Sequence, residues 1–192
     1  MTTLAGRHVR LEPLRPPHLP GLLAAATESR DSYDLTWVPG DAGSMLVYIQ
    51  QALTGPEAQA FAAIRISDDT IVGSTRLHDF VRWSGRAAPD AVEIGHTWYS
   101  RSAQRTPVNA EAKLLLLTQA FEAWQVVRVS LKTDARNERS RAAIARLGAR
   151  FDGVLRATNL TWDGTVRDTA YFSILAAEWP DVRTGLQARL AR

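Results

Sequence analysis

Cysteine is absent from the 192-residue sequence. Its absence excludes disulfide bonds, a thiolate nucleophile and zinc sites built on thiolates. No apolar run approaches the length of a membrane span, and the first residues lack the charged start and apolar stretch of a signal peptide. We therefore expect a protein of the cytoplasm with no membrane partner.

Lysine is scarce. Arginine provides 21 of the 23 cationic side chains, and the only lysines are Lys113 and Lys132. The formal net charge of +3 is consistent with affinity for phosphate or for acidic partners, and equally with a compositional bias toward arginine. No run of basic residues is dense enough to indicate nucleic-acid binding.

The chain is long enough to bury the core of one domain, and we expect residues 1–192 to form it. Alternating polarity and turn signals predict strands at 7–14, 61–66, 71–77, 91–98, 126–134, 154–162 and 166–175. Helical patterns cover 19–27, 41–53, 106–124 and 137–147, and a short helix follows Pro180. This order favours an α/β (α+β) fold, with one mixed sheet of about seven strands and helices on both faces.

The middle of the chain contains two helix starts beside one sheet. A polar turn at 100–105 leads into a helix at Thr106-Pro107, and a second helix opens at Asn137. The start of a helix presents free backbone N–H groups and the positive end of its dipole, which together attract anions. Two such starts indicate a phosphate-bearing cofactor.

Short motifs in a fixed order cover nearly the whole chain: Arg10-Leu11-Glu12-Pro13-Leu14, Glu111-Ala112, Asn137 with Ser140, Leu147-Gly148, Asp163-Gly164 and Arg167-Asp168. In this order and spacing the chain resembles the GNAT superfamily of N-acetyltransferases, and within it the branch of ribosomal-protein N-terminal acetyltransferases. The resemblance implies a GNAT-type fold, acetyl-CoA as acyl donor, and transfer of an acetyl group to a primary amine. That amine is a protein N-terminus, a peptide or a small molecule; the oligomeric state, monomer or homodimer, stays open.

The superfamily's pyrophosphate turn reads Gln/Arg-x-x-Gly-x-Gly/Ala, and here both small positions are replaced, in Gln104-Arg105-Thr106-Pro107-Val108-Asn109. Proline lacks an N–H, but Thr106 as N-cap and Pro107 at the first helical position make a good helix start. We expect the N–H groups of Val108, Asn109 and Ala110 to be free for phosphate, with Gln104 nearby and a charge-assisted contact from Arg105.

Two residues of the second helix start have double interpretations. Asn137 is the natural N-cap, and the resemblance implies that its side chain also binds the pantetheine arm or the acetyl region. Ser140 either faces solvent or, as the resemblance implies, protonates the leaving thiolate. The backbone N–H groups of Trp98 and Tyr99 fall where the preceding strand splays, and are candidates to bind the oxyanion.

In this family a free amine attacks the thioester directly, so a base is needed. Glu93 is the first choice because desolvation in an apolar strand favours proton uptake, although a strand-edge position or a salt bridge to an arginine is an equal alternative. His96 is second, unless strand alternation turns it to the opposite face. His78 and Asp79 are weaker candidates, a water chain is a further one, and no metal is expected.

Several residues on or near loops are candidates for an acceptor groove: Tyr33, Trp37, Phe80, Trp83, Arg82 and Arg86.

Two other functions remain open. One is a non-catalytic acyl-CoA or protein-binding module, motivated by the altered pyrophosphate turn. The other is an acyltransferase that uses a different donor such as succinyl-CoA, which would need a further arginine beside the acyl group.

Overall fold

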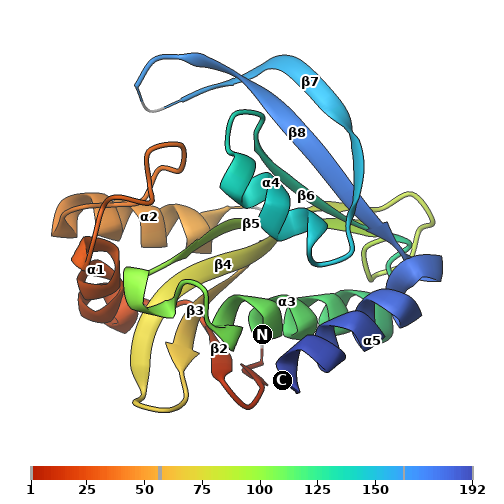
Figure 1. The fold of residues 1–192 in the computed structure, drawn as a ribbon, viewed down its shortest axis with the longest axis horizontal. Coiled ribbons are helices and arrows are strands. Elements are labelled where there is room, and N and C mark those ends of the chain that lie inside the picture. Colours follow the sequence, from red (N-terminus) through yellow and green to blue (C-terminus); the bar gives the residue numbers. More distant parts are fainter. Residues whose placement is uncertain (1, 56–57, 162, 192) are drawn as a thin grey trace.

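A computed structural model describes residues 2–55, 58–161 and 163–191. One mixed sheet of eight strands, in the order β1-β2-β3-β4-β5-β6-β8-β7, crosses the molecule (Figure 1). The strands are β1 (Leu4–Ala5), β2 (Val9–Pro13), β3 (Gln59–Arg65), β4 (Thr70–Val81), β5 (Ala91–Tyr99), β6 (Arg128–Asp134), β7 (Arg150–Leu160) and β8 (Val166–Leu175). The predicted fold class is confirmed; the short β1 is the strand that sequence patterning did not detect.

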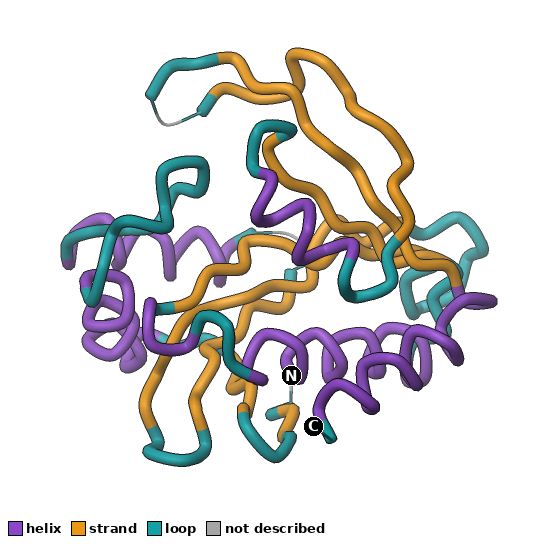
Figure 2. The backbone as a smooth tube through the Cα atoms, viewed as in Figure 1, coloured by secondary structure: helices purple, strands orange, loops and turns teal. Residues whose placement is uncertain are grey.

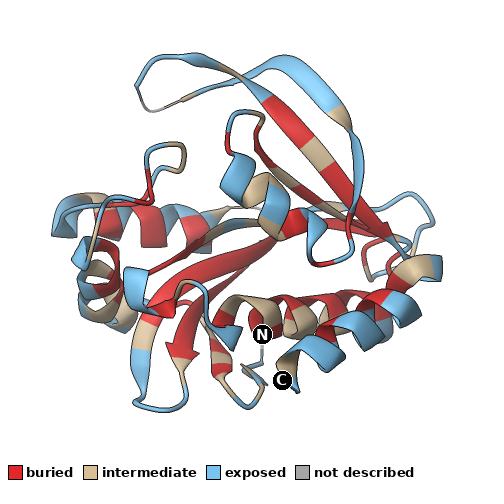
Figure 3. Cartoon of the chain, in the orientation of Figure 1, coloured by how far each residue is buried: buried red, intermediate tan, exposed pale blue. Residues whose placement is uncertain are grey.

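Five α-helices cover both faces of this sheet, as predicted: α1 (Leu19–Thr27), α2 (Ala42–Thr54), α3 (Pro107–Thr118), α4 (Glu138–Ala145) and α5 (Trp179–Leu190). Helices α1 and α2 share one buried cluster with Ala62 and Trp98. Helices α3, α4 and α5 contribute to the cluster on the other face, where α3 and α5 run side by side (Figure 1). The strands between these layers are the buried centre of the molecule (Figure 3).

Local signals account for most element boundaries. The Asp41 side chain accepts a hydrogen bond of 2.9 Å from the Ser44 N–H and begins α2, while Thr106 and Pro107 begin α3. The predicted helix 106–124 is wrong at its end, because α3 stops at Thr118 and a π-helical turn (Gln119–Ala123) follows. This wider turn places Phe121 against Trp179, with ring centroids 5.4 Å apart.

The β7–β8 hairpin extends beyond the helical layers (Figure 2). It forms around Asp163-Gly164 as predicted, and β7 begins at Arg150, earlier than predicted. Trp162, which the sequence places at the end of this strand, lies outside the described residues. Within the described part of the chain, no helix is both long enough and apolar enough to cross a membrane.

The feature that positions the site is the separation of β5 from β6. These two strands pair in parallel between Ala91–Glu93 and Arg128–Ser130, and the pairing ends there. Beyond Glu93, β5 pairs only with β4, through a bulge where His96 has a φ of +48°. The last six residues of β5 therefore have one open edge, whose backbone groups face away from β4.

Candidate active site

A cleft of about 900 Å³ opens where β5 and β6 separate. It is bounded by the 32–37 loop, β5, the starts of α3 and α4, β6, and the tip of the β7–β8 hairpin. It gathers most of the residues chosen from the sequence, namely Glu93, Trp98, Tyr99, Gln104, Arg105, Thr106, Asn109, Ala110, Asn137 and Ser140. Val108 does not line the cleft, because its side chain belongs to the core beneath α3.

The open edge of β5 distinguishes between the two predicted oxyanion donors. The Ser100 N–H donates to the Val72 carbonyl over 2.8 Å, so alternation along the antiparallel ladder directs the Trp98 N–H toward β4 and the Tyr99 N–H toward the cleft. Consistently, the Tyr99 carbonyl accepts from Tyr33 Oη at 2.9 Å and from Gln104 Nε2 at 3.0 Å, away from β4. Tyr99 is therefore the better-placed donor.

The start of α3 is built as a capped helix. Thr106 Oγ1 accepts from the Val108 N–H at 3.3 Å, and Pro107 has no N–H. The expectation that the Val108 N–H is free is wrong, because the N-cap hydroxyl occupies it. Asn109 and Ala110 still line the cleft, and Arg105, with a φ of +62°, is exposed beside them.

The start of α4 resolves an apparent conflict of roles. Asn137 Oδ1 accepts from the Ser140 N–H at 3.0 Å, which confirms the predicted N-cap. The cap uses only the oxygen of the amide, so the NH₂ group of Asn137 stays available to donate into the cleft. Capping and ligand binding therefore do not compete for one atom.

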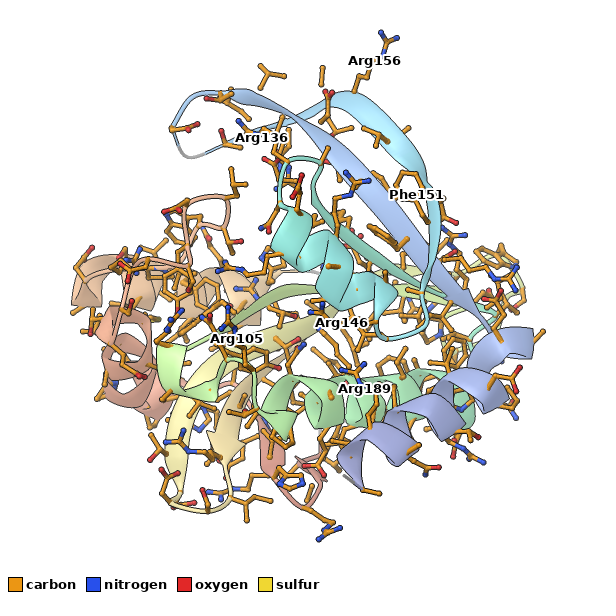
Figure 4. All side chains as sticks on the ribbon, in the orientation of Figure 1. Arg105, Arg136, Arg146, Phe151, Arg156 and Arg189 are labelled. Carbon is orange, nitrogen blue, oxygen red and sulfur yellow. The ribbon has the colours of Figure 1, made fainter. Side chains whose placement is uncertain are left out.

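The cleft is strongly cationic. Seven arginines and both lysines line it, against the acidic residues Asp34, Glu93 and Asp163. Arg105 at the start of α3 and Arg146 at the end of α4 have no carboxylate within ion-pair distance in the described part of the chain, and Arg189 of α5 donates to the Arg146 carbonyl (Figure 4). Fixed positive charge around a helix start attracts polyanions such as pyrophosphate.

Glu93 lies at the centre of an ionic cluster on the α2 side of the sheet. Only 5% of the residue is exposed; Oε1 lies 3.3 Å from His78 Nε2 and Oε2 lies 3.0 Å from Lys132 Nζ. Asp79 closes the cluster, at 3.1 Å from His78 Nδ1 and 3.5 Å from Lys132 Nζ. Glu93 is thus in an interior strand and paired with a lysine, rather than at an edge or paired with an arginine.

Desolvation opposes the charged form of His78, but hydrogen bonding and attraction to Glu93, helped by Asp79, raise its pKa. His78 and Glu93 are thus neighbouring ionisable groups that both line the cleft, and such pairs can take part in acid–base chemistry.

His96 lies beside this cluster, because the bulge breaks the strand alternation that would turn it away. Its ring packs edge-on against that of His78, with centroids 5.0 Å apart. Desolvation in the cleft, with the Arg76 charge next in importance, lowers the pKa of His96 to about 4. Gly95 makes room for this arrangement, since a Cβ there would lie 2.4 Å from His78 Nε2.

The loop candidates divide into two groups. Tyr33 and Trp37 line the cleft. Phe80 instead packs on Trp124, with ring centroids 5.4 Å apart, and Arg86 pairs with Asp90 at 3.1 Å.

Sequence reasoning missed the cleft roles of both lysines. Lys113 is buried and donates to Thr97 Oγ1 at 2.7 Å, and desolvation lowers its pKa to about 7. The available signal was that these two positions alone carry lysine in an arginine-rich chain.

Comparison with known proteins identifies the family. The family model described as "Acetyltransferase (GNAT) domain" matches residues 8–150. The chain is 30% identical over 112 residues to "Putative ribosomal N-acetyltransferase YdaF" of Bacillus subtilis (strain 168), and the match spans 58% of this chain and 57% of that relative.

Solved structures share the whole fold. A GCN5-related N-acetyltransferase from Brucella melitensis superposes with a TM-score of 0.89 at 28% identity, over 98% of this chain and 85% of that one. Mycobacterium smegmatis RimJ in complex with CoA-disulfide superposes with a TM-score of 0.77 at 22% identity, over 97% and 91% of the two chains. With three quarters of the sequence matched by one family, this chain belongs to the GNAT acetyltransferase family.

Proposed function

We propose that this protein is an N-acetyltransferase that transfers an acetyl group from acetyl-CoA to a primary amine in a ternary complex. The observation that carries the proposal is the cleft at the open edge of β5, which joins a cationic helix start to a buried carboxylate. A long donor with phosphates at one end and a thioester at the other fits this combination. The donor supplies an activated acyl group; the residues described above supply binding, orientation and proton transfer.

The donor half of the cleft is the α3–α4 side. Arg105, Asn109 and Ala110 line this side of the cleft, and we assign phosphate binding to the Arg105 side chain and the backbone of Asn109 and Ala110, with Arg146 also lining the cleft. The open edge of β5, with the Tyr99 N–H directed into the cleft, is where we expect an extended chain such as pantetheine to bind, and Asn137 lines the same cleft with its NH₂ group not used by the cap. The CoA-disulfide bound to the fold neighbour RimJ supports a CoA-type ligand here.

The catalytic half contains Glu93, Tyr99 and Ser140. An ammonium has no lone pair, so the acceptor must lose a proton, and we assign this step to Glu93, which lines the cleft. The Tyr99 N–H is directed into the cleft, and we assign it to binding of the developing oxyanion. Ser140 lines the same cleft and serves as the proton donor to the leaving thiolate. No covalent enzyme intermediate is required, so the lack of cysteine is no obstacle.

The acceptor is one of three amines: a protein N-terminus, a peptide or a small molecule. The word ribosomal in the name of the Bacillus subtilis relative favours a protein or peptide amine over a small molecule. Tyr33 and Trp37 on the 32–37 loop, with the tip of the β7–β8 hairpin opposite, form the wall that such an acceptor would meet.

Two measurements test the proposal. Thermal shift with acetyl-CoA should stabilise the protein at millimolar donor, because a ligand that binds only the native state raises its stability. A free-thiol assay over a panel of peptides, small amines, and acetyl- and succinyl-CoA should then identify the acceptor and the donor. No stabilisation at millimolar acetyl-CoA would refute the donor assignment.

Binding without turnover on any amine would instead favour a non-catalytic module. The specific reason to test this is the start of α3, where Pro107 removes one N–H and the Thr106 cap occupies the next.

A further inference from the structure

The two lysines of this chain lie in the same cleft. Every other basic side chain besides histidine is arginine, yet Lys113 and Lys132 both line the space at the open edge of β5. Arginine remains protonated in proteins, whereas a lysine amine can lose its proton and act as a nucleophile. The cleft thus contains the only side-chain amines of the molecule.

The two amines are held very differently. Lys132 extends from β6 between two carboxylates, 3.0 Å from Glu93 and 3.5 Å from Asp79. These ion pairs stabilise the ammonium form, whose nitrogen has no free lone pair. Lys132 is therefore a poor nucleophile despite its position.

Lys113 extends from α3 toward β5, on the face of the sheet opposite to the one that Lys132 occupies. The residue is 5% exposed, and Nζ donates to Thr97 Oγ1 at 2.7 Å. In the described part of the chain no carboxylate lies within ion-pair distance of it. An amine buried without a counterion favours its neutral form, and desolvation accordingly lowers the pKa of Lys113 to about 7.

The position of Lys113 relates it to the reacting end of the donor. Its partner Thr97 lies within the β5 bulge, two residues before Tyr99, and the Tyr99 N–H faces the cleft. Thr97, which holds the Lys113 amine, and Tyr99, at the proposed thioester site, both belong to the end of β5, and Lys113 lines the same cleft as both of them. Side-chain hydrogen bonding to Thr97 holds the amine there.

We propose that Lys113 is a self-acylation site, at which the acyl group of a cleft-bound acyl-CoA is transferred to Nζ. The neutral amine attacks the thioester carbonyl carbon; the N–C bond forms, the C–S bond breaks, and CoA leaves as the thiolate. The proton lost by the amine nitrogen neutralises that thiolate, so the products are an amide on Lys113 and free CoA. The inference rests on the proposed donor binding, and on no amine acceptor.

The experiment incubates the intact protein with acetyl-CoA and no acceptor amine, and follows intact mass with peptide mapping. We expect one acetyl group per chain, located on Lys113. Lys132→Arg should keep the modification, while Lys113→Arg and the uncharged Lys113→Met should both lose it. Circular dichroism and calorimetric titration with CoA on every variant show that fold and donor binding persist.

A competitor separates cleft-bound transfer from bulk chemistry. Desulfo-CoA should suppress acetylation of Lys113, and acetyl phosphate, which lacks the nucleotide, should modify it far more slowly than acetyl-CoA does. Acetylation of Lys132 alone, or labelling that desulfo-CoA does not suppress, would refute the inference. CoA binding with an unmodified Lys113 would also refute it and leave the proposed function standing, whereas failure to bind CoA would refute both.

Discussion

Glu93 and Glu111 are each only 5% exposed, but their surroundings differ in kind. Glu111 on α3 accepts three backbone hydrogen bonds, from the N–H groups of Arg7, His8 and Val9 at 2.8, 2.6 and 2.8 Å. Glu93 on β5 contacts two ionisable side chains, His78 and Lys132. One carboxylate is satisfied by fixed donors, the other by groups that can exchange protons.

This difference in partners is the reason to assign a structural role to Glu111 and to propose a chemical role for Glu93. The three backbone donors fix the Glu111 carboxylate, which in turn fastens the β1–β2 turn to α3. Gly6 allows the turn to close over it, since a Cβ there would overlap the carboxylate. Glu93 faces a cleft, where an approaching amine can join its network. Of these two carboxylates only Glu93 combines ionisable partners with access to a ligand, which is why we propose Glu93 and not Glu111 as the base.

The largest effect is expected at the structural carboxylate. Glu111→Ala leaves three backbone donors without their partner and should lower the free energy of unfolding by about 3–5 kcal/mol, because a buried unpaired donor costs about 1–3 kcal/mol and water can reach the part-buried N–H groups of Arg7 and His8. Urea denaturation measures it. Glu138→Ala, at an exposed position of α4, is the control and should change stability little. Equal losses in both variants would contradict the role of Glu111.

The next effect is on the rate. Glu93→Gln removes the proposed base with almost no change of shape, and should lower kcat by about 10²–10³-fold, as loss of a general base does. The affinity for acetyl-CoA should hardly change, because Glu93 is outside the proposed donor half of the cleft. Glu111→Gln is the matched control and should keep kcat per folded molecule. An unchanged rate in Glu93→Gln would exclude Glu93 as the base.

A third buried ionisable group, Lys113, has neither kind of partner. Its pKa in the folded protein, about 7, lies below the ordinary value of 10.5, so between these values the unfolded chain binds the extra proton. Wild-type stability should therefore rise as the pH increases from 7 toward 10.5.

Lys113→Met should accordingly stabilise the protein by about 2 kcal/mol at pH 7, with a gain that shrinks at higher pH. Thermal denaturation at pH 7, 8.5 and 10 measures this trend. A gain independent of pH would show that packing, and not charge burial, sets the effect.

The smallest effect concerns the start of α3. Thr106→Ala removes the N-cap and should cost about 1 kcal/mol of stability. It also frees the Val108 N–H, so the affinity for acetyl-CoA per folded molecule should stay equal or rise slightly. Calorimetric titration measures the affinity, with Thr184→Ala, an exposed residue in α5, as control. A marked loss of affinity would show that the hydroxyl itself binds the donor.

The site shows where sequence-based prediction works. Thr106, Pro107 and Asn137 were correctly assigned as helix-start residues because capping depends on neighbours within three positions. The motif order gave the family, and with it the residues that meet in the cleft. The prediction failed for the Val108 N–H because the same helix start was expected both to be capped by Thr106 and to bind phosphate. In the structure the Thr106 hydroxyl accepts this N–H.

By itself the sequence determined the elements, the family and the two helix starts, since those depend on local periodicity, capping and residue order. The tertiary structure decided which groups are buried together. The bulge that turns His96 toward His78, the direction of the Tyr99 N–H, and the contrast between Lys113 and Lys132 all follow from strand register and burial. Register and burial are set by contacts between segments far apart in the chain, which local sequence patterns do not encode.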